Sequence, residues 1–233
     1  MRKGTQTPWL QRHERRLTPR STGPATAGPM KIQSHIDEIV DAATKRYLLI
    51  LSIHLRSANG KNFYLTDLVI FGLINRNLGL LRALPDLVKE RNIHALAPLI
   101  RVQLDGLLRL NAFRVAGSME DLAMYVISGN SLRKFKDQDG QPMTDAHLVK
   151  LLKENLPWIE DMYKSLSGWT HFSESHIFSA ASIGEKKGSF VLAVGSMESI
   201  PDQLFLEATG AIDAIHSATC ELIENYFNRL AGI

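Results

Sequence analysis

The segment YKSLSGWTHFSESH, residues 163–176, concentrates side chains that can do chemistry. If residues 158–172 form a helix, Tyr163, Ser167 and His171 lie on one face at positions i, i+4 and i+8. A phenol, a hydroxyl and an imidazole in line can transfer protons or bind an anion. The same three groups can instead be a polar seam that only fixes how two helices pack.

A second polar stripe lies in residues 93–115, which are otherwise apolar on nearly every side and predict a central helix. Arg101, Asp105 and Arg109 follow one another at four-residue steps, so they share a face and Asp105 can pair with either arginine. Charges on a core-forming helix need partners, which makes a structural ion-pair ladder the preferred interpretation. A ligand-binding stripe is the alternative.

The two polar stripes could satisfy each other if their helices pack face to face. Asp105 could then fix the tautomer of His171, and Arg101 could bind an anion beside it. That arrangement would suit acid–base chemistry on a phosphodiester, with His171 as general acid or base and an arginine stabilising charge. A buried hydrogen-bond network without catalysis is the preferred interpretation of the pair.

Other site chemistries find little support in the sequence. His171, Glu174 and His176 form H-x-x-E-x-H, which is neither of the zinc-helix spacings. The DQDG of the loop 136–145 lacks the further acidic positions of a calcium site. We expect no metal and no cofactor, since phosphate-loop and dinucleotide motifs are also missing. Trp169 could stack a base, although core packing is the commoner fate of a tryptophan.

Composition and net charge limit the classes of partner and the cellular location that we expect for this protein. The 233 residues carry a net charge of +3, but residues 1–30 hold six Lys or Arg and one Glu. Residues 31–233 therefore sum to −2, so global charge gives no support for binding a phosphate backbone. The single cysteine cannot form an internal disulfide, which favours a cytoplasmic location. No apolar run reaches the length of a membrane span, and we expect no membrane partner.

The chain divides into a tail and one domain. Residues 1–29 are rich in Pro, Arg and Ser without apolar periodicity, and predict a disordered basic tail or an upstream extension before Met30. Residues 30–233 predict a single all-α domain, a bundle of about six or seven helices with one late β-hairpin near 177–195. The expected helices span residues 31–56, 65–83, 93–115, 118–128, 144–155, 158–172 and 201–230.

The segments LIRVQLDGLLRL (99–110) and YKSLSGWTHFS (163–173) together resemble uncharacterised bacterial helical proteins. These carry an Arg-x-x-x-acidic step in a central helix, then Tyr-x-x-Leu-Ser and a histidine. They are similar to the HEPN superfamily, helical domains that include metal-independent ribonucleases, toxins and phage-defence proteins. The resemblance covers roughly residues 65–175.

The resemblance implies site residues that coincide with the two stripes, namely Arg101, Asp105, Tyr163, Ser167 and His171. Active HEPN ribonucleases place an arginine four to six residues before the histidine. Here Lys164, seven positions before His171, is the nearest basic residue. Either Arg101 supplies the charge from another helix, or the nuclease activity is absent.

Three functions remain open at this point. The first is a non-catalytic HEPN-like module that binds a nucleotide, RNA or a partner protein through the region of Arg101 and His171, with Arg109, Lys164 and Trp169 beside it. The second is a metal-independent endoribonuclease, a toxin or phage-defence effector, which needs a basic groove leading to His171. The third is a structural or oligomerising bundle, including a homodimer, for which exposed apolar surface on the terminal helices is the expected sign.

Overall fold

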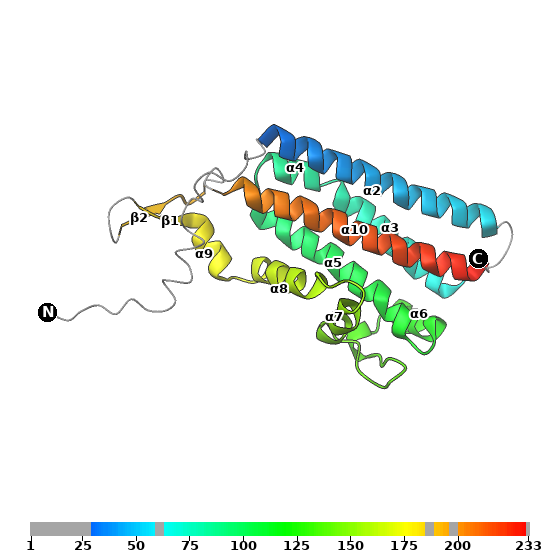
Figure 1. The fold of residues 1–233 in the computed structure, drawn as a ribbon. Helices are drawn as coiled ribbons and strands as arrows, with labels where there is room; N and C mark the ends of the chain where they lie inside the picture. Colours follow the sequence, from blue (N-terminus) through cyan, green and yellow to red (C-terminus); the bar gives the residue numbers. More distant parts are fainter. Residues whose placement is uncertain (1–28, 59–62, 185–188, 196–199, 232–233) are drawn as a thin grey trace.

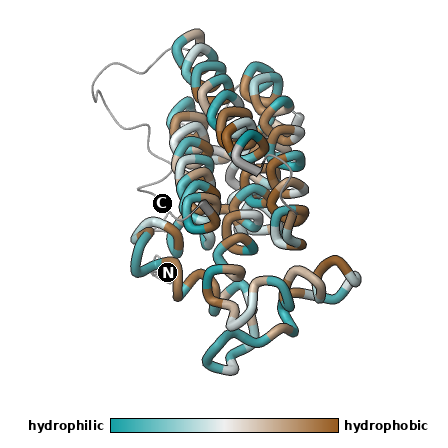
Figure 2. The backbone as a smooth tube through the Cα atoms, turned by 90° about the vertical axis from the view of Figure 1, so that its right-hand side faces the viewer, coloured by the Kyte–Doolittle hydropathy of each residue, from teal (hydrophilic) through white to brown (hydrophobic). Residues whose placement is uncertain are grey.

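Four long helices form a bundle in the computed structural model; three of them run in the same direction, and the helix that begins at Leu65 runs in the opposite direction (Figure 1). The structure describes residues 29–58, 63–184, 189–195 and 200–231. The bundle helices are α2 (Pro29–Ala58), α3 (Leu65–Leu81), α5 (Ile93–Val115) and α10 (Asp202–Ala231). Hydrophobic residues recur along these helices (Figure 2), and the all-α prediction is confirmed. The predicted tail lies outside the described residues except for Pro29, where α2 begins.

Helix α5 lies at the centre of the molecule, as its all-round apolar pattern predicts. Ile100, Leu104 and Leu107 are completely buried. Helix α3 approaches α5 closely, because a Cβ added at Gly106 would lie 2.8 Å from Leu73 Cδ1. The polar stripe on α5 is therefore held on a rigid, fully packed element.

Shorter helices lie along one side of α5 and at both ends of the bundle (Figure 1). They are α4 (Leu84–Lys89), α6 (Met119–Ile127), the 3₁₀ turn η1 (Leu132–Lys134), α7 (Asp145–Lys153), α8 (Ile159–Thr170) and α9 (Glu174–Ala180). Helices α7 and α8 pack on α5 and on each other. The predicted cap of α7 is present, since the Thr144 hydroxyl accepts a hydrogen bond from the His147 N–H. The two polar stripes therefore lie on α5 and α8, two helices that pack against each other.

The region after α8 differs from its predicted form. Helix α8 ends at Thr170 rather than at residue 172, and His171 follows it in an extended conformation. The Ser173 hydroxyl accepts a hydrogen bond from the Ser175 N–H and starts α9, so residues 177–180 are helical rather than part of a strand.

The late β-hairpin is confirmed in a shorter form. Strand β1 (Ala181–Ile183) pairs antiparallel with β2 (Phe190–Leu192). Its predicted GEKKG turn falls largely on residues 185–188, which lie outside the described residues.

The bundle core contains a small polar network. The Tyr47 hydroxyl lies 2.7 Å from His216 Nδ1 and accepts a hydrogen bond from Asn77 Nδ2 at 3.1 Å. All three side chains are buried, and each comes from a different bundle helix. Burial lowers the pKa of His216 to about 4 and raises that of Tyr47, so both groups are neutral at pH 7. The network joins α2, α3 and α10.

Residues Leu65–Lys89, which form α3 and α4, are long and apolar enough to cross a membrane by length and composition. A soluble core helix of this composition is usually mostly buried. Only 28% of the most apolar window is buried in the protein. The outer surface of α3 is therefore unusually apolar.

Candidate functional site

The arginines of the α5 stripe lie close to Asp145, an aspartate that was not among the site residues expected from the sequence. Asp145 is the first residue of α7, and its side chain is 7% exposed. Its carboxylate lies 2.8 Å from Arg109 Nη1 and 2.7 Å from Arg133 Nη2, and it accepts a hydrogen bond from the Tyr163 hydroxyl at 3.3 Å. Asp145 thus joins α5, η1 and α8 through one carboxylate.

Arg101 and Asp105 complete this arrangement. The Arg101 guanidinium lies over the Tyr163 ring, 4.2 Å from its centre, and its Nη2 is 3.5 Å from the Asp145 carboxylate. Asp105 lies 2.9 Å from Arg109 and 3.8 Å from Arg101. We define the arginine cluster as Arg101, Asp105, Arg109, Arg133, Asp145 and Tyr163. Four of these six residues belong to the two predicted stripes.

The arginine cluster carries an excess of positive charge. Burial raises the pKa of Asp145, but hydrogen bonds from Arg133 and Arg109 outweigh it and hold that pKa at about 2. The hydrogen bond to Asp145 also raises the pKa of Arg133. Three arginines therefore face two aspartates, and the net charge of the cluster is +1 at pH 7 when both carboxylates are ionised. The Arg133 side chain is 59% exposed and presents that charge to solvent.

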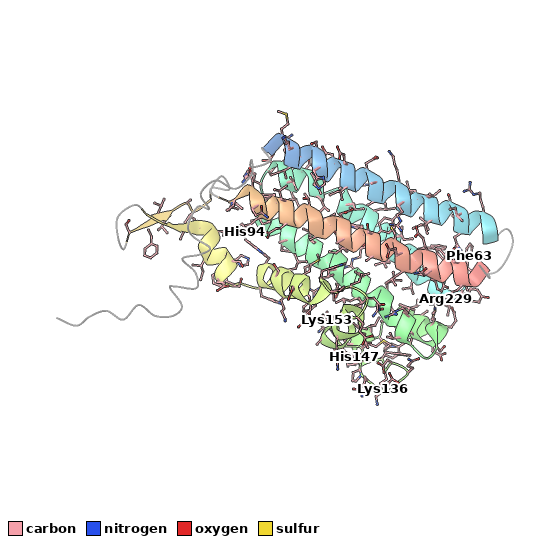
Figure 3. The ribbon with its side chains drawn as sticks, viewed as in Figure 1. Phe63, His94, Lys136, His147, Lys153 and Arg229 are labelled. Carbon is pink, nitrogen blue, oxygen red and sulfur yellow. The ribbon has the colours of Figure 1, made fainter. Side chains whose placement is uncertain are left out.

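Further basic residues follow Arg133 in the sequence. Arg133 belongs to the sequence LRKFK, in which Lys134 and Lys136 are also exposed. Residues 129–153 contain five Lys or Arg and three Asp, so this part of the chain is positive although the domain as a whole is not. Lys136 lies at the α7 end of the molecule (Figure 3). The basic run was a sequence signal for this edge.

His171 and Ser167 do not join the arginine cluster. His171 is exposed just beyond α8, and its backbone N–H donates to the Ser167 carbonyl. Among the described residues, no hydrogen bond or ion pair links the His171 imidazole or the Ser167 hydroxyl to an arginine. Lys164 is also exposed, and its ammonium pairs with Glu160 at 2.7 Å. The structure therefore does not bring His171 to Arg101, because α8 ends one residue before His171.

Trp169 packs among imidazoles instead of facing the arginines. Its ring lies edge-on to His94 at 5.7 Å and to His176 at 5.5 Å, and the two histidines stack on each other. Burial, and then the neighbouring His176, lower the pKa of His94. In the described part of the chain, no group of three or more His, Cys, Asp or Glu side chains is placed to hold a metal ion. The Trp169 contacts hold α9 against α5 and α8.

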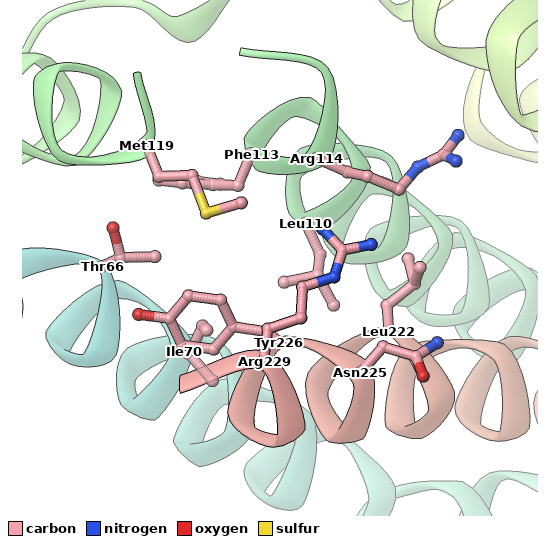
Figure 4. Close-up of a pocket in the computed structure, with 10 residues that line it drawn as sticks. All are labelled: Thr66, Ile70, Leu110, Phe113, Arg114, Met119, Leu222, Asn225, Tyr226 and Arg229. Atoms are coloured by element: carbon pink, nitrogen blue, oxygen red, sulfur yellow. The ribbon is translucent and has the colours of Figure 1, made fainter. Parts of the chain in front are cut away.

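Two cavities in the described part of the protein are not lined by the arginine cluster. One cavity of about 40 Å³ lies between α3, α5 and α10, with Tyr226 beside it and Arg114 and Arg229 near it (Figure 4). Another, of about 160 Å³, lies between α2, α4 and α10 and is lined by Arg91 and Phe205 among others. Ligand pockets usually measure about 300–1,000 Å³. Neither cavity approaches that size, so the cluster is the stronger candidate site.

Comparison with known proteins adds no relative whose function could be carried over. No family model matches the chain, and no curated protein or solved structure matches it either. The proposals that follow depend on the geometry and charge of the chain itself.

Proposed function

We propose that this protein is a HEPN-like, non-catalytic helical module that binds RNA or a nucleotide through phosphate contacts at the arginine cluster. The observation that carries the proposal is the convergence of Arg101, Arg109 and Arg133 on one buried carboxylate with an excess positive charge. A cytoplasmic location belongs to the same proposal, because the single cysteine of the chain, Cys220, is buried and free. A bacterial source belongs to it through the resemblance alone.

The geometry of the cluster suits an anion with several oxygens. Guanidinium groups bind phosphate with two parallel N–H donors, and they lose less entropy when they are already held in place. Arg101 is held by the Tyr163 ring and Arg109 by two carboxylates. Arg133 is held by Asp145 yet remains 59% exposed, so a phosphate can approach it from solvent. Lys134 and Lys136 would attract the same ligand through long-range electrostatics.

Binding is favoured over cleavage because the cluster contains no group suited to proton transfer at neutral pH. Its ionisable groups are guanidiniums, carboxylates and one phenol, and the Asp145 carboxylate has a pKa of about 2. General acid–base catalysis works best with a group whose pKa lies near the working pH. The histidine that could serve, His171, is exposed just beyond α8, and within the described ranges it forms no hydrogen bond or ion pair with the three arginines.

We expect Arg133→Gln to weaken RNA binding about tenfold, since a hydrogen bond to a charged group contributes on the order of 1.5 kcal/mol. The measurement is fluorescence anisotropy of a labelled single-stranded RNA titrated with the full chain at several salt concentrations. Loss of one phosphate contact should also reduce the slope of log K against log salt by about 0.7.

Lys45→Gln is the charge-matched control, because Lys45 is an exposed cation on α2 that pairs with Asp41 on the same helix. It should leave the affinity and the salt slope unchanged. Equal losses in Arg133→Gln and Lys45→Gln would mean that net charge alone drives binding, which contradicts a site. A tight complex with an acidic peptide and none with RNA would also overturn the proposal.

The ribonuclease alternative makes the opposite prediction at His171, whose exposure would give a substrate access to the imidazole. We expect the full chain to leave a mixed RNA intact without metal, and His171→Ala to bind RNA as the wild type does. The products are resolved by denaturing gel electrophoresis. Cleavage that disappears in a folded His171→Ala variant would replace the binding proposal with the nuclease.

A further inference from the structure

The outer face of α3 carries an exposed leucine and two exposed glycines, although no part of the protein that the structure describes packs on that face. Leu68 is 54% exposed, and Gly72, Asn75 and Gly79 are exposed along the same side of the helix. A Cβ placed on Gly72 or Gly79 meets no heavy atom within 4 Å in the described part of the protein. Each glycine inside a helix costs about 1 kcal/mol relative to alanine. Gly106, by contrast, is explained by its contact with Leu73.

The face carries no free charge on α3 itself. The helix from Leu65 to Leu81 contains two charged residues, Asp67 and Arg76. Asp67 is buried and accepts a hydrogen bond from Tyr226. Arg76 turns toward α5, where its Nη2 donates to the Val102 carbonyl at 2.7 Å. An uncharged helix surface with small residues lets a second helix approach closely.

One edge of α2 extends this apolar surface. Leu48 and Leu55 are 52% and 51% exposed, and they lie near Leu51 on one side of the helix. Gln33, five turns before Leu51 on the same side, donates to the Pro85 carbonyl in α4, which places this edge of α2 toward α3 and α4. We define the apolar face as Leu48, Leu51, Leu55, Leu68, Gly72, Asn75 and Gly79.

We propose that the apolar face binds a second copy of this chain, with α3 packed antiparallel against α3 of the other copy. The exposed positions of α3 and of the turn that follows it are symmetric about the midpoint between Asn75 and Arg76. Gly72 then faces Gly79 of the other copy, and Leu68 faces its Ala83, as a two-fold interface requires. Asn75 then lies next to the axis, opposite Arg76 of the other copy, where its side-chain amide can donate and accept hydrogen bonds.

The surface area that the apolar face would bury is what a weak dimer requires. A helix of this length is about 25 Å long, and two helices side by side are about 20 Å wide. The apolar face therefore covers about 500 Å² per copy, or about 1,000 Å² in total, which is the lower bound for a specific interface. This inference concerns a different surface from the arginine cluster and does not depend on it.

Sedimentation equilibrium of the full chain tests the proposal. We expect a concentration-dependent mass that approaches twice 26.0 kDa at high micromolar protein. Gly72→Glu should abolish the dimer, because it places a charge and a long side chain on the closest approach. Gly210→Glu is the matched control, since Gly210 is also an exposed helical glycine with nothing within 4 Å of its Cβ position, but lies on α10.

A cysteine at the axis supplies a positive test. Cys220 is buried, so Asn75→Cys adds one accessible thiol among the described residues, and two copies should form a disulfide under mild oxidation. Lys45→Cys should remain largely monomeric.

Three outcomes would overturn the proposal: a wild type that stays monomeric, a dimer that persists in Gly72→Glu, or a monomer that floats with phosphatidylglycerol-containing vesicles. The last would identify the apolar face as a membrane-binding surface.

Discussion

Asp145→Ala should destabilise the protein by about 3–5 kcal/mol, since removing one partner of a buried ion pair leaves the others uncompensated. The side chain is 7% exposed and neutralises Arg101, Arg109 and Arg133 together. Its loss leaves three guanidiniums near Asp105 alone. Urea denaturation followed by circular dichroism measures the change in the free energy of unfolding.

Two variants show whether the loss of stability in Asp145→Ala comes from the burial of this carboxylate and from its contacts with three arginines. Asp161→Ala removes an exposed aspartate from α8 and should change stability by less than about 0.5 kcal/mol. Arg133→Ala removes the most exposed arginine of the three and should cost less than about 1 kcal/mol. If Asp145→Ala cost no more than Asp161→Ala, the carboxylate would not be the centre of the cluster.

The stability of the protein should fall by about 3 kcal/mol as the pH drops from 6.5 to 4, because of His216. Burial lowers the pKa of this histidine in the folded protein from 6.5 to about 4. Between these values the unfolded chain binds the proton and the folded protein does not, so acid favours unfolding. The contribution is fully present above pH 6.5 and is lost as the pH falls toward 4. Urea titrations across this range measure it.

Substitution of the histidine isolates its contribution. His216→Gln cannot titrate, so its free energy of unfolding should vary less with pH between 4 and 6.5, whatever its absolute stability. His171→Gln removes an exposed histidine and should leave the wild-type pH dependence in place. An unchanged pH dependence in His216→Gln would contradict the assignment of the buried Tyr47–His216 pair.

Local patterns in the sequence were sufficient for most of the helices. Apolar residues at three- and four-residue steps predicted the bundle helices, and Thr144 correctly predicted the start of α7. The pairing of Arg109 with Asp105 followed from spacing on one helix. These features depend on neighbours within about one turn, so sequence alone could predict them.

Contacts between distant segments were harder to predict. Asp145 lies 36 residues after Arg109, and nothing in the spacing relates them. The end of α8 depended on the Ser173 cap of the next helix, which competes with continuation of α8 past Thr170. Because α8 ends at Thr170, His171 does not lie on the helix face that carries Tyr163 and Ser167. The position of Arg133 beside Asp145 depends on the path that the chain takes through η1, so it could not be predicted from local spacing.

The most direct test of phosphate binding at the arginine cluster is side-chain NMR of ¹⁵N-arginine-labelled protein during titration with a short RNA. The account predicts that the Nε–Hε signals of Arg133 and Arg109 shift most, with Arg101 next, and that Arg56 on α2 stays unchanged. Shifts spread evenly over exposed arginines, or confined to arginines outside the cluster, would contradict it.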